Sequence, residues 1–258
     1  MVFQAAVFVL STSYVAWYFE RFETQAIYPF DKTYVTPSDA GAPGLQEERV
    51  RMPDGETLVV WHAPPSADRP TILYFSGNAG GLKSRSDRFQ SLIGQGFGLV
   101  APAYRGSSGS TGMPDETVIM HDARLLARMY DQQELVLYGE SLGTAVAIRL
   151  AAEGVGERLV LEAPFTSIPD LILAQHPTEK LDHLITQRWN SRDHVGGVAQ
   201  PLLIIHGTED RLVPIAMGEA ILESAGSVKK QLLRIENASH TTLWTGGMQA
   251  VLFDFLDD

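Results

Sequence analysis

The sequence predicts an α/β fold in which helices flank a mostly parallel central sheet. Strand-like and helix-like runs alternate along most of the chain, and 258 residues suffice for one substantial core. Several of the strand-like runs are unbroken apolar stretches, which is typical of a parallel sheet covered on both faces. The clearest examples are Thr71–Phe75, Leu135–Tyr138 and Leu202–Ile205.

The alternation begins after a stretch rich in chain breakers. Residues 23–47 contain three prolines and two glycines, which predict an irregular connection leading into one domain over residues 48–258. Strands are predicted at 57–62, 71–75, 98–101, 135–138, 158–161, 202–205 and 231–235. Helices are predicted at 82–95, 115–130, 142–152, 215–224 and 247–256. About residues 163–200 we expect no strand and a few helical turns, so this region predicts a minimal lid.

Composition excludes several function classes. The formal charge of −11 argues against nucleic acid as a partner, because phosphate binding requires a basic surface. It also argues, more weakly, against a strongly anionic membrane or substrate. The chain has no cysteine, which removes thiol nucleophiles, disulfides and thiolate metal sites.

The N-terminal residues 1–22 form a separate apolar segment. Met1 to Phe19 contain no charged side chain, and about twenty such residues span a bilayer. No basic n-region precedes the apolar stretch, so it does not fit a signal peptide. Two interpretations stay open: a membrane anchor or membrane-facing helix, and a helix packed on the domain or on another copy. The location, membrane-associated or cytoplasmic, and the oligomeric state stay open with them.

The sequence Gly139-Glu140-Ser141-Leu142-Gly143 lies between a strand-like run and a helix-like run. A serine between two glycines at such a junction is the layout of a nucleophile elbow. The turn holds the hydroxyl at the carboxyl end of the sheet, and the following helix offers free N–H groups to an anion. Ser141 is therefore the predicted nucleophile.

A serine nucleophile needs a base and a group that orients the base. Asp210 follows an apolar strand, with Glu209 as its rival and a structural turn aspartate as the alternative. His240 follows the last strand, where the order serine, carboxylate, histidine requires the base. His206 lies within the acid loop, and we expect it to pack beneath that loop.

A glycine-rich loop follows the strand 71–75, with the sequence Ser76-Gly77-Asn78-Ala79-Gly80-Gly81. The backbone N–H groups of Asn78 and Leu142 are the predicted oxyanion hole. The alternatives are a phosphate-binding loop and a plain turn. No lysine–serine pair of a P-loop follows, and the spacing is not that of a dinucleotide motif, so a nucleotide site is disfavoured.

These motifs together resemble those of the α/β-hydrolase superfamily, over residues 48–258. Within it, the chain is similar to serine hydrolases with a short N-terminal hydrophobic segment and little cap, a group related to protein depalmitoylases and bacterial esterases. That group usually has histidine where this chain has Ser76, so the support under the glycine loop must differ, with the Ser76 hydroxyl as one candidate. The matching segments are 76–80, 104–109, 139–143, 162–167 and the loops ending at Asp210 and His240.

The expected function is a serine carboxylic-ester hydrolase that works through an acyl-enzyme on a small-molecule or lipid-like ester. Such chemistry needs no cofactor and no metal. The alternatives are an acyl-protein or acyl-carrier thioesterase and a membrane-associated binding protein that keeps the fold without catalysis. Four residues are expected near the pocket mouth, with core packing as the alternative for each: Tyr104, Phe165, Leu212 and Trp244.

Overall fold

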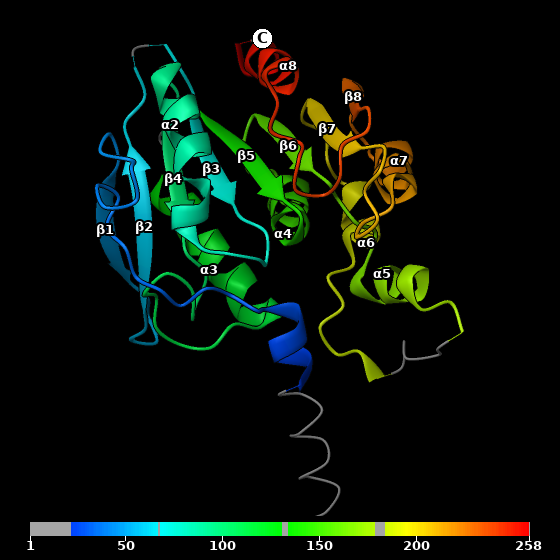
Figure 1. The fold of residues 1–258 in the computed structure, drawn as a ribbon, viewed down its shortest axis with the longest axis horizontal. Helices are drawn as coiled ribbons and strands as arrows, with labels where there is room; N and C mark the ends of the chain where they lie inside the picture. The colour runs from blue at the N-terminus through cyan, green and yellow to red at the C-terminus, as the bar shows by residue number, and fades with distance from the viewer. Residues whose placement is uncertain (1–21, 67, 131–133, 179–183, 258) are drawn as a thin grey trace, which may run out of the picture.

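The computed structural model describes residues 22–66, 68–130, 134–178 and 184–257. Its centre is an eight-stranded sheet with the order β1-β2-β4-β3-β5-β6-β7-β8 (Figure 1). The strands are β1 (Gln46–Arg51), β2 (Thr57–Ala63), β3 (Thr71–Phe75), β4 (Gly98–Pro102), β5 (Leu135–Glu140), β6 (Arg158–Glu162), β7 (Leu202–Gly207) and β8 (Lys230–Ile235).

The sheet is antiparallel at one edge and parallel elsewhere. β1 pairs with β2 and β2 with β4 in antiparallel register, whereas β4, β3, β5, β6, β7 and β8 run parallel. All five residues of β3 and all six of β7 are buried, as an apolar strand covered on both faces should be. The predicted fold class, a mostly parallel sheet flanked by helices, is confirmed.

Helices cover both faces of the sheet. Phe89 and Leu92 of α2 pack with Leu252 and Phe255 of α8 in the core of one face. The core of the other face is formed with α3, α4, α6 and α7. The helices are a short 3-10 turn η1 (Leu82–Arg85), α2 (Ser86–Gly94), α3 (Glu116–Met129), α4 (Leu142–Ala152), α5 (Ile168–Gln175), α6 (Ser191–Val195), α7 (Ile215–Ser224) and α8 (Gly246–Asp257).

The edge strand β1 is not among the predicted strands. Only Val50 of its six residues is buried, because the strand lies at the sheet edge with charged side chains toward solvent. The alternation of apolar and polar residues on which strand prediction depends is therefore missing. Charged side chains on an edge strand oppose pairing with other chains.

Residues 22–45, which are mostly irregular after a short helical stretch, pack on the domain. Residues 22–27 are helical, and the Glu23 carboxylate accepts hydrogen bonds from the backbone N–H groups of Thr186 and Gln187. Tyr28 and Phe30 are buried in the core on the α4 face of the sheet. The sequence does not predict this packing, because residues 23–47 contain many prolines and glycines and only a few aromatic residues, with no periodic apolar pattern.

Between β6 and β7 the chain forms α5 and α6, and α5 lies on the same side of the molecule as the helical residues 22–27 (Figure 1). The helix expected over residues 1–22 lies, except for residue 22, outside the described residues. In the part of the chain that the structure describes, no helix has both the length and the apolar character needed to cross a membrane.

Candidate active site

Ser141 occupies a strained turn between β5 and α4. Its backbone φ is 48°, a left-handed value that non-glycine residues rarely adopt. A Cβ on Gly143 would lie 2.0 Å from the Phe75 carbonyl oxygen, and one on Gly139 would lie 2.5 Å from the Thr144 Cα. Both glycines are therefore required by close backbone packing, which holds Ser141 at the carboxyl end of the sheet.

The structure brings three predicted residues together. His240 Nε2 lies 3.0 Å from Ser141 Oγ, and His240 Nδ1 lies 2.7 Å from Asp210 Oδ2. A carboxylate at Nδ1 favours the tautomer that carries its proton there, which leaves the Nε2 lone pair facing the serine hydroxyl. In this arrangement His240 Nε2 can accept the proton of the Ser141 hydroxyl.

Backbone donors fix the Asp210 carboxylate. Its Oδ1 accepts hydrogen bonds from the N–H groups of Leu212 at 2.9 Å and Val213 at 2.8 Å. Burial alone would raise the Asp210 pKa, but the hydrogen bonds from His240 and Val213 outweigh it and leave the pKa below its ordinary value. The rival Glu209 is exposed, whereas Asp210 is buried.

His206 packs beneath the acid loop. Its ring is fully buried, and its Nε2 lies 2.9 Å from the carbonyl oxygen of Val213 and 3.6 Å from Asp210 Oδ2. Burial lowers the pKa of His206, which keeps the imidazole neutral. It supports the loop that carries Asp210 and does not contact Ser141 in the described structure.

The glycine loop lies directly against Ser141. A Cβ on Gly77 would lie 3.3 Å from the Cβ of Ser141, so loop and elbow are in van der Waals contact. Within the described ranges, neither the Asn78 N–H nor the Leu142 N–H has a hydrogen-bond acceptor. The Ser141 N–H, in contrast, donates to the Glu162 carbonyl oxygen at 2.8 Å. Among the described residues, the N–H groups of Asn78 and Leu142 are therefore free to donate a hydrogen bond, whereas the N–H of Ser141 is not.

The support of this loop differs from the expectation for Ser76. The Ser76 hydroxyl has no hydrogen-bond partner in the part of the chain that is described, whereas its carbonyl oxygen accepts from the Tyr104 hydroxyl at 2.9 Å. On the other side of the loop, Asn78 Nδ2 donates to the Ile27 carbonyl oxygen at 2.9 Å. Ile27, which precedes the domain, and the buried Tyr104 thus both bind the loop.

The four residues expected at the pocket mouth divide into two pairs. Tyr104 and Phe165 are buried in the core, which agrees with the alternative of core packing that was left open for them. Leu212 is exposed beside Asp210, and Trp244 is half-buried with the Arg88 guanidinium 4.5 Å from its ring centroid.

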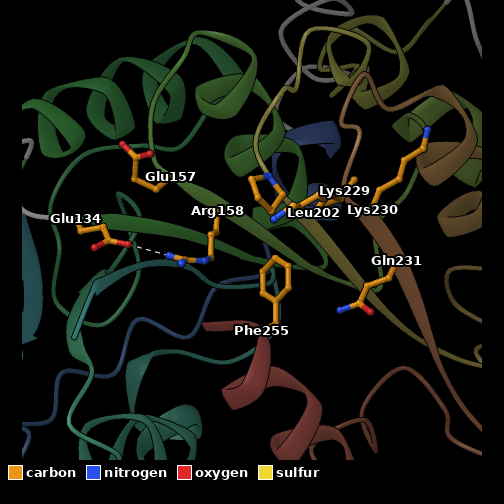
Figure 2. Close-up of a pocket in the computed structure, with 9 residues that line it drawn as sticks. Glu134, Glu157, Arg158, Leu202, Lys229, Lys230, Gln231 and Phe255 are labelled. Atoms are coloured by element: carbon orange, nitrogen blue, oxygen red, sulfur yellow. Dashed lines mark hydrogen bonds and ion pairs between the residues drawn. The ribbon is translucent and has the colours of Figure 1, made fainter. Parts of the chain in front are cut away.

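An open cavity of about 490 Å³ lies at the opposite end of the sheet, at the amino ends of β5 to β8. Figure 2 shows Arg158, Lys229 and Phe255 in its lining, none of which belongs to the loops that carry Ser141, Asp210 and His240. Across the described ranges, no group of three or more His, Asp or Glu side chains is placed to hold a metal ion.

Comparisons with known proteins give the family. The chain is 30% identical over 199 residues to an uncharacterised protein of Mycobacterium tuberculosis, covering 74% of this chain and 71% of that protein. It is 29% identical to protein bem46 of Schizosaccharomyces pombe, covering 89% and 87%. It is 28% identical to lysophosphatidylserine lipase ABHD12 of Danio rerio, covering 75% of this chain and 62% of that protein.

Among solved structures, esterase Pf2001 of Pyrococcus furiosus superposes with a TM-score of 0.71 at 18% identity, covering 89% of this chain and 95% of that one. The chain belongs to the α/β-hydrolase superfamily. No family model matches it. In α/β hydrolases the nucleophile, acid and base follow one another in this order along the chain, and Ser141, Asp210 and His240 do the same.

A group of buried charges that the sequence motifs do not predict lies beneath the turn at Ser141. Arg85 and Arg88 of the η1–α2 segment reach Glu140 and Glu162 at the carboxyl ends of β5 and β6. One signal was present: Glu140 occupies the variable position of the elbow motif, next to the nucleophile. A charge at the end of an apolar strand needs a partner, and the partner could be sought among nearby arginines.

Proposed function

We propose that this α/β hydrolase is a serine carboxylic-ester hydrolase that acts through an acyl-enzyme. Ser141 is the nucleophile, His240 the general base and then general acid, and Asp210 the group that orients His240. The observation that carries the proposal is the unbroken hydrogen-bond chain from Ser141 Oγ through His240 to Asp210.

The first half of the reaction acylates Ser141. The Oγ proton moves to His240 Nε2 as Oγ forms a bond to the ester carbonyl carbon. The carbonyl oxygen becomes an oxyanion, which the free N–H groups of Asn78 and Leu142 stabilise by hydrogen bonds. The intermediate then collapses: the C–O bond to the alcohol breaks, and the alcohol oxygen takes the proton from His240.

The second half releases the acid. Water gives a proton to His240 Nε2 and attacks the acyl carbon, which forms a second oxyanion in the same place. The bond to Ser141 Oγ breaks, Oγ recovers the proton from His240, and the carboxylic acid departs. The N-terminus of α4 lies at the oxyanion and adds its positive dipole end in both halves.

A lipid-like ester is the substrate class that we infer. The apolar residues 1–22 favour action at a lipid surface, and one relative carries the name of a lysophosphatidylserine lipase. A thioester would enter the same reaction, since the oxyanion forms in the same way. The comparison of ester with thioester therefore belongs in the test.

Labelling by a fluorophosphonate probe tests the nucleophile. We expect wild-type protein to be labelled and Ser141→Ala to be unlabelled and inactive, with Ser224→Ala as a control at an exposed serine outside the site. Absence of labelling, or labelling that persists in Ser141→Ala, would contradict the proposal.

A substrate panel tests the class of acyl group. We expect hydrolysis of p-nitrophenyl esters of graded acyl length and of a lysophospholipid, with matched acyl thioesters measured at the same concentrations. A kcat/KM for the thioesters well above that of the esters would favour the thioesterase function. Inert protein with an intact fold would favour a non-catalytic binding protein.

We also propose that residues 1–22 associate with membranes. Flotation with phosphatidylcholine vesicles, comparing the full chain with a chain lacking residues 1–22, tests this independently of catalysis. Flotation of the full chain alone is expected. Equal recovery of both chains from the soluble fraction would overturn the proposal.

A further inference from the structure

Two arginines and two glutamates form a buried network directly beneath the nucleophile elbow. The side chains of Arg85 and Arg88 are 8% and 14% exposed, and those of Glu140 and Glu162 are 20% and 4% exposed. The hydroxyls of two buried tyrosines complete the network: Tyr74 donates to Glu140 Oε2 at 2.7 Å, and Tyr138 donates to Glu162 Oε2 at 2.6 Å.

Within this network Arg85 contacts two different parts of the site. Its Nε and Nη2 donate to Glu140 Oε2 and Oε1, both at 2.7 Å, in a bidentate pair. Its Nη1 donates to the carbonyl oxygens of Ala79 at 3.0 Å and Gly81 at 3.2 Å. One rigid guanidinium therefore joins the glycine loop to the residue that precedes Ser141.

The loop rests on this ion pair as well as on the nucleophile. A Cβ on Gly77 would lie 3.3 Å from Glu140 Oε1 and 3.4 Å from Arg85 Nη2. Because Arg85 holds the loop carbonyls that follow Asn78, it restricts the path of the loop where the Asn78 N–H must meet the oxyanion. A displacement of about 1 Å at such a donor is enough to reduce catalysis.

The ion pair is costly to bury, and its geometry offsets that cost. Burial alone would lower the Arg85 pKa, but the Glu140 carboxylate outweighs it and leaves the pKa raised. The same pairing, against burial, holds the pKa of Glu140 well below its ordinary value. Since apolar residues often replace such pairs without loss of stability, stability alone does not account for the pair.

We infer that Arg85 is a positioning residue, which holds the oxyanion loop in register with the nucleophile elbow through Glu140. The inference rests on the proposed serine hydrolase function. Arg85 does not touch the substrate and acts through the Asn78 N–H. Its removal should weaken stabilisation of the oxyanion while leaving Ser141, His240 and Asp210 in place.

Arg88 provides a matched control. It is also a buried arginine of the network, and its Nη1 donates to Glu162 Oε2 and to the Tyr74 hydroxyl, both at 2.7 Å. Across the described residues it makes no hydrogen bond to the loop 76–81. A general effect of removing a buried arginine should therefore appear in variants of both Arg85 and Arg88. Weaker stabilisation of the oxyanion should appear only in variants of Arg85.

The experiment compares an oxoester with its thionoester, in which sulfur replaces the carbonyl oxygen. Sulfur accepts hydrogen bonds poorly, so the ratio of kcat/KM for the two substrates reports how well the oxyanion is held. In Arg85→Gln and Arg85→Lys we expect kcat for the oxoester to fall about 10- to 100-fold with KM little changed, and the ratio to fall about tenfold. In Arg88→Gln the ratio should stay at the wild-type value.

Two further results decide the interpretation. Arg85→Lys keeps the positive charge but cannot bridge Glu140 and two carbonyl oxygens. If Arg85→Gln does not fold, the ratio of kcat/KM for the oxoester and the thionoester is measured in Arg85→Lys instead. An unchanged ratio in folded Arg85 variants, or an equal fall in Arg88→Gln, would overturn the role of Arg85. Absence of Ser141-dependent hydrolysis in wild-type protein would instead overturn the proposed function.

Discussion

The two ends of the parallel sheet differ in how far their ion pairs are buried and in which residues adopt a positive φ. At the carboxyl end, Arg85 and Glu140 are buried and paired, whereas at the amino end Arg158 pairs with Glu134, whose side chain is 54% exposed. At the carboxyl end, the residues with positive φ after β5, β6 and β8 are Ser141, Ala163 and Asn237. At the amino end, glycines such as Gly96, Gly154 and Gly156 take such values without strain, and Asp68 before β3 is a non-glycine residue that also takes one.

The cavity of Figure 2 and the candidate active site therefore lie at opposite ends of the sheet. The cavity of Figure 2 lies at the amino end, among charged side chains such as Glu134, Arg158 and Lys229. The non-glycine residues with positive φ that follow β5, β6 and β8, and the buried ion pairs, lie at the carboxyl end, and such features often mark functional sites. In parallel α/β sheets the carboxyl end is also where ligands bind.

The largest expected effect tests the proposed triad at the carboxyl end. In Asp210→Asn, the amide nitrogen facing His240 Nδ1 would favour the wrong tautomer, so we expect kcat to fall about 10³- to 10⁴-fold. Ester hydrolysis under saturating substrate measures it. The neighbouring Glu209→Gln, at an exposed carboxylate, should keep wild-type activity. A comparable loss in both variants would contradict the assignment of Asp210.

Much of this was predictable from the sequence, for a physical reason. Unbroken apolar runs such as those of β3 and β7 predict parallel strands. The order of the polar loops after the strands predicts that Ser141, Asp210 and His240 lie at one end of the sheet, and the hydrogen bonds of His240 join the three. The Arg85–Glu140 pair was not predictable, because its burial depends on how η1 packs across the end of β5. Edge strand β1 was not predicted, and the choice between core and pocket stayed open for Tyr104, because neighbours in space, not in sequence, set the exposure of both.

Paired glycine substitutions test the packing difference between the two ends. In Gly143→Ala the new Cβ would meet the Phe75 backbone, so we expect misfolding or a loss of several kcal/mol in the free energy of unfolding. In Gly154→Ala the space is open and only the left-handed φ opposes the change, at about 1–2 kcal/mol. Guanidinium chloride unfolding measures both. Equal losses would refute the difference.

Neutralising one glutamate at each end tests the difference in charge burial. Glu140→Gln leaves the buried Arg85 without its carboxylate, so we expect a loss of about 3 kcal/mol. Glu134→Gln removes an exposed partner of Arg158 and should cost less than about 1 kcal/mol, an effect that salt reduces. Urea unfolding at low and high salt provides both values. A Glu134→Gln loss as large as that of Glu140→Gln would contradict the comparison.

The smallest expected effect concerns His206 and pH. Burial holds the pKa of His206 below the ordinary value of 6.5. His240 also lowers this pKa, whereas the hydrogen bond to Val213 and the carboxylates of Asp210 and Glu219 raise it without outweighing burial. The unfolded chain therefore binds a proton that the folded chain does not, and stability falls as pH drops below 6.5. We expect His206 to contribute about 1 kcal/mol to this fall over one pH unit.

Unfolding measured at pH 7.5 and pH 5.5 tests the effect of His206. His206→Gln should show a smaller loss between the two pH values than wild type does. His176→Gln, at an exposed histidine, should behave as wild type. A wild-type slope in His206→Gln would assign the pH dependence to other groups.

The contacts of residues 22–45 with the glycine loop limit where the chain can be shortened. Asn78 bonds to the Ile27 carbonyl, and the Asp31 N–H donates to the Gly80 carbonyl at 3.3 Å. A shortened protein that starts at residue 22 keeps both contacts, whereas one cut to the domain limits suggested by the sequence, at residue 48, loses them. A fusion partner or immobilisation tag on this side therefore belongs ahead of residue 22.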